Sequence, residues 1–166
     1  MAEEAEAAAA AAEKNQNGKM IVAVDESGCS SYALKWALQN LGDKLKSGVI
    51  LFTAVSVTQS GVFAGGYGTV PLDLVTTIQQ NQKKFATSLL TKAKEICAQY
   101  GVDAETLCVM GNPKDAICDA VEKFHCNLLV MGTHSRGALQ RAFLGSVSNY
   151  CIHHAKCPVL VVRKRV

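Results

Sequence analysis

The sequence predicts an α/β protein in which five short, mostly parallel strands form one doubly wound sheet with helices on both faces. Two observations carry this prediction. Runs of consecutive apolar residues, typical of strands buried on both faces of a parallel sheet, alternate with longer segments that repeat apolar residues at helical spacing. The length of 166 residues suits one domain with its own hydrophobic core. Right-handed crossovers between parallel strands then place helices on both faces.

The chain divides into a tail and a domain by composition. Residues 1–18 are rich in Ala and Glu and end in Asn and Gly. We expect them to be disordered, because an isolated helix of this length is marginal in water. Residues 19–166 form the predicted domain.

The sequence of the first part of the domain predicts two strands with a helix between them. An apolar run over 20–25 is the first strand, and a turn follows in which Ser30 or Ser31 can cap a helix. That helix ends before Gly42, a residue type that suits a C-terminal cap. A second apolar run, over 49–57, is the next strand.

A Gly-rich loop over 58–72 follows the second strand, and a loop of this length within a domain is usually functional or mobile. Pro113 suits the first position of a later helix, where the missing N–H is not needed. The remaining predicted elements are a helix over 73–100, a strand over 104–110, a helix over 113–124, a strand over 127–131, a helix over 146–154 and a strand over 158–162.

Charge and cysteine content exclude several classes of protein. The net charge of +3 is too small to indicate nucleic-acid binding, which needs a basic patch or stripe. The seven cysteines are an odd number without a C-x-x-C pair or zinc-ligand spacing, which favours reduced thiols over a disulfide framework. A redox-switched oligomer is a weaker alternative that these cysteines leave open.

The sequence also predicts where the protein resides. The acidic, Ala-rich N-terminus differs from a secretory signal, which starts basic, and from an Arg-rich transit peptide. No apolar stretch approaches the roughly 18 residues of a membrane span. We therefore expect a soluble, cytoplasmic protein without membrane contact, and a nuclear location stays open.

The loops that follow the strands form the expected binding site. In an open parallel sheet, ligands bind beyond the carboxyl ends of the strands, where the strand order reverses. Gly132 follows an apolar strand, and a side chain there would obstruct close backbone approach. Gly145 precedes a helix with Ser146 and Ser148, and the free N–H groups of such a helix start suit phosphate. His134, Arg136 and Arg141 add positive or potentially positive charge, and neither a Walker A loop nor G-x-G-x-x-G is present.

Five segments make the domain resemble the universal stress protein family, and a single-domain plant-type member in particular. They lie in the order and spacing of that family, from Lys19 to Arg163: Ile21-Val22-Ala23-Val24-Asp25, Gly111-Asn112-Pro113, Leu129-Val130-Met131-Gly132-Thr133-His134, Leu144-Gly145-Ser146-Val147-Ser148 and Cys157-Pro158-Val159-Leu160-Val161-Val162. The resemblance implies a Rossmann-like fold that binds an adenine nucleotide.

The resemblance also implies roles for particular residues. Asp25 would approach the ribose or a metal-bound phosphate, while Ala23, Val24 and Ala54 would line the adenine. Met110 and Gly111 would flank the ribose. The implied phosphate-binding residues are Gly132, His134, Ser135, Gly145, Ser146, Val147 and Ser148. From the residues alone, Asp25 could instead cap the helix that follows it.

The ATP-binding branch of the family has Gly, two residues, Gly, nine residues, Gly, then Ser or Thr. Gly132 and Gly145-Ser146 fit this pattern, but Ser135 stands at the second Gly. If the backbone there needs a positive φ, Ser costs about 1–2 kcal/mol. Ser135 therefore leaves open whether the site binds nucleotide.

Three functions follow from the resemblance. The first is a dimeric stress-response regulator that binds ATP or AMP, with Mg²⁺ or Mn²⁺ held through the nucleotide and Asp25. The second is a nucleotide-independent, dimeric scaffold or chaperone-like protein with unknown protein partners, and the third is a slow, metal-dependent ATP hydrolase. No catalytic set stands out, and the protein is not expected to be a fast enzyme. Dimers of the family commonly pair the last strand with its copy, here Pro158 to Val162.

Overall fold

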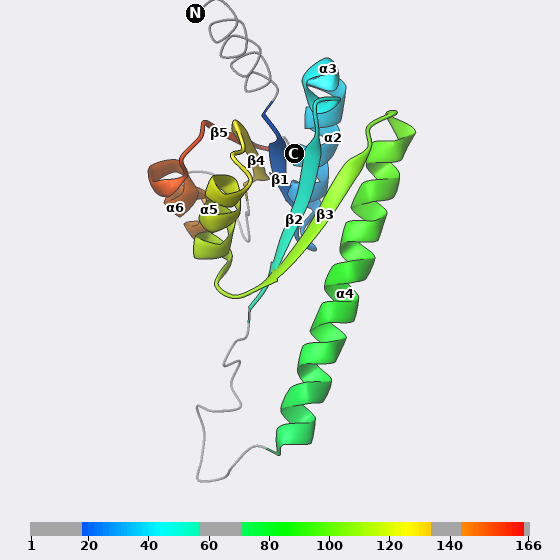
Figure 1. Cartoon of the computed structure of the whole chain (residues 1–166), viewed down its shortest axis with the longest axis vertical. Coiled ribbons are helices and arrows are strands. Elements are labelled where there is room, and N and C mark those ends of the chain that lie inside the picture. Colours follow the sequence, from blue (N-terminus) through cyan, green and yellow to red (C-terminus); the bar gives the residue numbers. More distant parts are fainter. Residues whose placement is uncertain (1–17, 57–70, 134–143, 165–166) are drawn as a thin grey trace, which may run out of the picture.

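The computed structural model describes residues 18–56, 71–133 and 144–164. These residues include a five-stranded sheet in the order β3-β2-β1-β4-β5 (Figure 1). Each pairing of neighbouring strands is parallel, which confirms the predicted fold class. The strands are β1 (Met20–Ala23), β2 (Val49–Val55), β3 (Ala104–Met110), β4 (Leu128–Gly132) and β5 (Val159–Val162).

Helices cover both faces of this sheet (Figure 1). One face carries α2 (Gly28–Asn40) and α4 (Leu72–Gln99), with the short α3 (Gly42–Leu45) after α2. The other face carries α5 (Pro113–Lys123) and α6 (Ser146–His154). The structure therefore contains the predicted helices and adds α3, which the sequence reading missed.

Alternating side chains of the strands fill two hydrophobic cores. In β1, Met20 and Val22 lie in the core under α2 and α4, while Ile21 lies in the core under α5 and α6. Ile21 and Val22 are fully buried. Burial on both faces explains why the central strand reads as a continuous apolar run.

The prediction that Ser30 or Ser31 caps the first helix was wrong. The helix begins earlier, at Gly28, because the side chain of Ser27 accepts a hydrogen bond from the Ser30 N–H and thereby satisfies a free donor of the first turn. Gly42 does follow the end of α2, but it begins α3 rather than adopting a left-handed cap. At α5, Pro113 takes the first helical position as expected, and Asn112 caps the helix through the Lys114 N–H.

Several predicted features lie outside the described residues. They include nearly all of the tail over 1–18, most of the Gly-rich loop over 58–72, and the loop that holds His134 and Ser135. The last residue of that Gly-rich stretch, Leu72, begins α4.

The cysteines predict how stability depends on alkaline pH. All seven are free, and burial raises the pKa of Cys97 and Cys126 to about 11. Burial, reinforced by Cys118, raises the pKa of Cys151 to about 12. A thiol whose pKa is higher in the folded state stabilises the fold below its unfolded pKa, and this stabilisation is lost as the pH rises toward the folded pKa. Urea unfolding should show the free energy of unfolding falling by on the order of 1–2 kcal/mol for each of these three thiols between about pH 8 and about pH 10.5.

A variant that lacks one thiol assigns the effect. Cys126→Ala removes one buried thiol, and its stability should fall less steeply with pH than that of the wild type. An equal slope in the two proteins would contradict the assignment to buried thiols.

Candidate ligand-binding site

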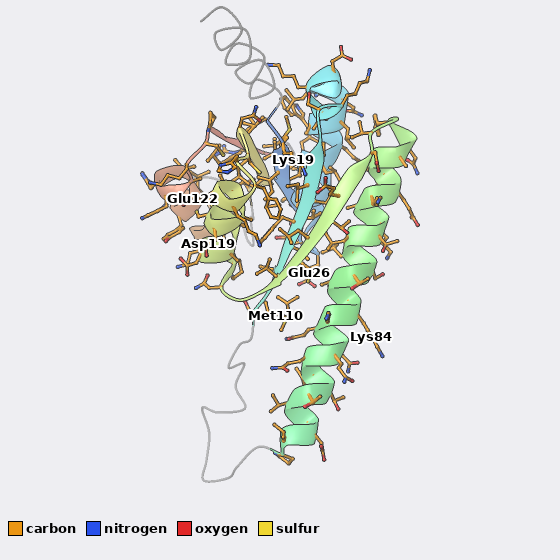
Figure 2. The ribbon with its side chains drawn as sticks, in the orientation of Figure 1. Lys19, Glu26, Lys84, Met110, Asp119 and Glu122 are labelled. Atoms are coloured by element: carbon orange, nitrogen blue, oxygen red, sulfur yellow. The ribbon has the colours of Figure 1, made fainter. Side chains whose placement is uncertain are left out.

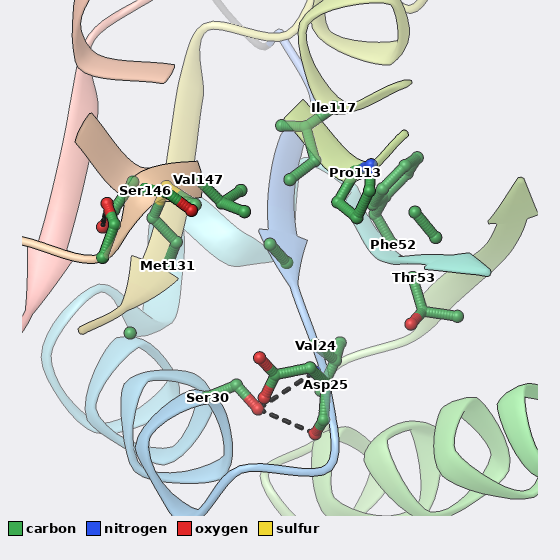
Figure 3. Close-up of a pocket in the computed structure, with 15 residues that line it drawn as sticks. Val24, Asp25, Ser30, Phe52, Thr53, Pro113, Ile117, Met131, Ser146 and Val147 are labelled. Carbon is green, nitrogen blue, oxygen red and sulfur yellow. Dashed lines mark hydrogen bonds between the residues drawn. The ribbon is translucent and has the colours of Figure 1, made fainter. Parts of the chain in front are cut away.

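A cavity of about 450 Å³ opens at the carboxyl ends of the central strands (Figure 3). It lies where the strand order reverses, because β1 sits between β2 and β4 and the chain leaves it toward β2 and returns at β4. This reversal point is where open parallel sheets bind ligands. The cavity therefore occupies the position that the sequence predicted for a binding site.

The cavity brings together many of the predicted site residues, although they come from distant parts of the chain. These residues are Ala23, Val24, Asp25, Ala54, Gly132, Gly145, Ser146, Val147 and Ser148. Met110 ends β3 and Gly111 follows it; neither lines the cavity, and the Met110 side chain is exposed. His134 and Ser135 lie outside the described residues.

Further lining residues were not predicted as site residues: Ser30, Phe52, Thr53, Pro113, Ile117 and Met131. Phe52 and Thr53 directly precede the predicted Ala54, and Met131 directly precedes the predicted Gly132. Ile117 lies one turn after Pro113 in α5. In the sequence, Ser30 and Pro113 indicated helix starts, whereas the other four lay in predicted strands or a helix core. Those four are buried.

One side of the cavity is apolar. Phe52 projects from β2, while Pro113 and Ile117 project from α5 (Figure 3). Ala54, two residues after Phe52 on the same strand, also lines the cavity. Phe52 and Ile117 are almost fully buried in the core between the sheet and α5, so this wall is fixed by packing. A rigid apolar wall of this kind suits a flat ring system.

The other side of the cavity presents the N-terminus of α6. Gly145 precedes this helix without a side-chain cap, and the first turn holds no acidic residue. The first intrahelical bond runs from the Asn149 N–H to the Gly145 carbonyl at 2.9 Å, so the N–H groups of the preceding turn have no partner within the helix. These amides and the positive end of the helix dipole favour an anion.

The two serines of this turn differ in what they offer a ligand. The Ser148 hydroxyl is buried and donates to the Gly145 carbonyl at 3.0 Å, so it holds the helix start together. Ser146 is the first residue of the helix and lines the cavity. The expected hydroxyl donor to a phosphate is therefore Ser146 rather than Ser148.

Asp25 lies at the edge of the cavity and organises the turn between β1 and α2. Its carboxylate accepts hydrogen bonds from the Ser27 N–H at 2.8 Å and from the Ser27 hydroxyl. Its backbone N–H donates to the Ser30 hydroxyl at 3.1 Å (Figure 3). The alternative that Asp25 caps α2 was wrong: Ser27 is the cap, and Asp25 holds Ser27 in place.

Gly132 ends β4 where the first turn of α2 crosses it. A Cβ atom at this position would lie 2.5 Å from the carbonyl oxygen of Cys29 and 2.9 Å from the Ser30 nitrogen. Both are backbone atoms of the helix, which cannot move aside like a flexible side chain. The absence of a side chain is thus required for α2 to reach the cavity edge.

Within 18–56, 71–133 and 144–164, no group of three or more His, Cys, Asp or Glu side chains could hold a metal ion. In the same ranges, no helix combines the length and apolar character needed to cross a membrane.

The fold and cavity define a doubly wound α/β protein with a ligand site at the reversal point of its sheet. The profile of the universal stress protein family matches residues 16–163, and the chain belongs to that family. A universal stress protein from Bacillus subtilis, YxiE, is 32% identical over 145 residues, which cover 87% of this chain and 98% of that protein. A universal stress protein A-like protein from Arabidopsis thaliana is 34% identical over 87 residues, about half of each chain (52% and 50%).

Solved structures share the fold. The universal stress protein UspA from Lactobacillus plantarum superposes with a TM-score of 0.73 at 21% identity and covers 89% of this chain and 98% of its own. A family member from Arabidopsis thaliana, solved with AMP bound, has a TM-score of 0.63 at 25% identity over 90% of this chain and 93% of its own. Another universal stress protein, solved in complex with cAMP, has a TM-score of 0.64 at 24% identity over 87% of this chain and 96% of its own. Related proteins thus bind adenine nucleotides.

Proposed function

We propose that this protein binds an adenine nucleotide, ATP or AMP, in the cavity between β1 and β4 and acts as a stress-response regulator. The observation that carries the proposal is the division of the cavity into a rigid apolar wall and an amide-rich helix start. A nucleotide has the same division, with an apolar base at one end and phosphate at the other. The AMP-bound relative supports the choice of adenine.

The cavity supports one orientation of the nucleotide. The adenine lies against Phe52, Ala54 and Ile117, where a flat ring replaces water on an apolar wall. The phosphates point to the N-terminus of α6, where Ser146 and the free amides meet negative charge. The ribose then lies near Asp25, whose carboxylate suits a sugar hydroxyl.

A divalent cation fits this arrangement only together with the nucleotide. Among the described residues that line the cavity, Asp25 is the one acidic residue. Mg²⁺ is commonly held by one or two carboxylates and by substrate phosphates, and Mn²⁺ accepts similar oxygen ligands. Asp25 would therefore hold the cation, which would neutralise part of the phosphate charge.

Three further features belong to the same proposal. The protein is a homodimer that pairs Pro158 to Val162 with its copy, since β5 is an edge strand of the sheet that the described residues form. It is a single-domain, plant-type member, in line with its Arabidopsis relatives. It acts in the cytoplasm through protein partners that read the nucleotide-bound state.

Calorimetric titration tests the proposal. The purified protein is stripped of co-purified nucleotide and titrated with ATP and AMP, with and without Mg²⁺. We expect saturable binding of roughly one nucleotide per chain in the micromolar range. Mg²⁺ should tighten the binding of ATP more than that of AMP, because ATP carries more phosphate charge.

A variant that fills the base end of the cavity serves as the control. Ala54→Phe places a ring where the adenine should lie, and binding of both nucleotides should disappear while the fold is kept. An absence of binding by the wild-type protein would contradict the proposal. It would favour the nucleotide-independent scaffold, for which Ser135 in the glycine motif is the supporting observation.

A further inference from the structure

Helix α4 is much longer than the part of the sheet it covers. Its 28 residues extend about 42 Å, whereas the seven residues of the neighbouring β3 extend about 23 Å. Figure 1 shows its N-terminal half projecting past the carboxyl end of the sheet. The buried residues of α4 all lie in the other half, from Ala86 to Cys97.

The projecting half nevertheless carries large apolar side chains. Leu72 is 79% exposed, Leu74 47%, Ile78 37% and Phe85 57%. Leu74 and Ile78 are four residues apart and Phe85 follows seven later, so these three lie on one side of the helix. Leu72 lies two positions before Leu74 and faces elsewhere, so we call Leu74, Ile78 and Phe85 the α4 stripe. Single exposed apolar residues are common, but a continuous stripe usually marks a contact surface.

Charges beside the stripe indicate what could contact it. Asp73 lies in the first turn of α4, and Lys84 lies eleven positions later, which is about three helical turns. Both side chains therefore stand on the same flank, with opposite charges at opposite ends of the stripe. Figure 2 shows Lys84 extending away from the sheet. Lys83, by contrast, is close enough to β3 to lower the pKa of Cys108 against the dominant effect of burial.

These charges complement the same segment running in the opposite direction. In an antiparallel pair whose two-fold axis passes between Ile78 and Gln79, Asp73 is level with Lys84 of the partner subunit. The same axis places Phe85 two positions, about 3 Å along the helix, from Leu74 of the partner subunit, and Ile78 one position from Ile78 of the partner subunit. One symmetry operation thus matches the charges and the apolar ends together.

We propose that the projecting half of α4 binds the same segment of a second copy of this chain as an antiparallel, two-fold helix pair. Such an interface is isologous, so each contact occurs twice. Burial of the α4 stripe supplies the driving force, and the Asp73–Lys84 pairs set the direction and the register. The interface involves few residues, so the association depends on protein concentration.

This interface is separate from the ligand cavity and from the dimer proposed through β5. Helix α4 packs on β2 and β3, and β3 and β5 are opposite edges of the sheet. One chain can therefore use both interfaces at once, and the resulting assembly would be larger than a dimer.

Phe85→Glu tests the surface. Light scattering and sedimentation velocity over a range of concentrations should show that the wild-type protein reaches a higher mass than the variant, by a factor of about two. Thr76→Glu is the matched control, since Thr76 is exposed on the same half of the helix but lies two positions from both Leu74 and Ile78 and so faces elsewhere. It should keep the wild-type mass.

An equal mass for Phe85→Glu and the wild type would overturn the proposal. If the unfolding free energy of that variant falls while its mass is unchanged, the α4 stripe packs against another part of the same chain rather than against a second copy.

A charge exchange tests the register. Asp73→Lys places like charges together at both ends of the pair, so the association should weaken several-fold and should strengthen, instead of weakening, as salt is added. Adding Lys84→Asp restores opposite charges, so the double variant should recover the wild-type association. The double variant retains Lys at position 73, so the recovery cannot come from helix stability. A double variant that associates no better than Asp73→Lys would overturn the antiparallel arrangement.

Discussion

Gly132→Ala is expected to lower the free energy of unfolding by about 2–3 kcal/mol, within the range of overpacked cores. The added methyl group would meet the carbonyl oxygen of Cys29 at 2.5 Å and its carbonyl carbon at 2.6 Å. Because these are backbone atoms, α2 must move away from β4 to relieve the contact. Urea unfolding monitored by circular dichroism measures the effect.

Gly42→Ala is the control for this substitution. A methyl group at Gly42 meets no atom within 4 Å, and the residue lies at the start of α3 without a positive φ. Alanine there should be neutral or stabilise the protein by about 0.4–1 kcal/mol, because it restricts the unfolded chain. If the two variants were equally stable, the close approach of α2 to β4 would not be what requires glycine at position 132.

Ser146→Asp is expected to weaken nucleotide binding at least tenfold while leaving the protein as stable or more stable. A carboxylate at the first residue of α6 interacts favourably with the helix dipole, which stabilises the fold by about 0.3–1 kcal/mol. The same carboxylate repels phosphate and occupies the amides that a phosphate would use. Opposite signs for stability and binding would therefore identify the helix start as the phosphate site.

Two measurements on the same samples separate these effects. Calorimetric titration with ATP and AMP gives the affinity, and thermal unfolding without nucleotide gives the stability. Ser146→Asn is the isosteric neutral control and should lose much less affinity than Ser146→Asp. Equal affinities for the Asp and Asn variants would show that no negative charge binds at this helix.

The strands were predictable because β1, β2 and β4 are buried on both faces. Ile21 lies in the core on one face of the sheet and Leu51 in the core on the other face. Both faces of these strands therefore favour apolar residues. The edge strand β3 is partly exposed, with Glu105 and Thr106 pointing to solvent. The apolar residues around these two predicted the strand. The strand ends were less certain, since hydrogen bonding rather than composition sets them.

The helix start at Gly28 shows where local patterns stop being informative. Ser27, Ser30 and Ser31 are all suitable caps by residue type. The choice depends on Asp25, which holds Ser27 from the end of β1, and on Ser30, which bonds back to that turn. Such a choice follows from three-dimensional contacts that the order of residues does not display.

The candidate site was predictable where glycines and small residues broke a pattern, as at Gly132 and Gly145. It was not predictable where one residue serves both core and cavity. Ile117 is buried among apolar neighbours and also forms part of the cavity wall. The exposed stripe of α4 was equally hidden, because its exposure depends on where β3 ends rather than on the helix itself.

The order of strands also has a consequence for how the protein folds. β1 pairs with β2, which is close in sequence, and with β4, where Met20 aligns with Leu128 across more than half of the chain. Closing so large a loop is slow because its entropy must be lost before the contacts form. The cavity lies across this long-range pairing, so it is completed only when the late half of the chain docks on the early half. A ligand bound there therefore favours the fully assembled sheet over any partly folded form.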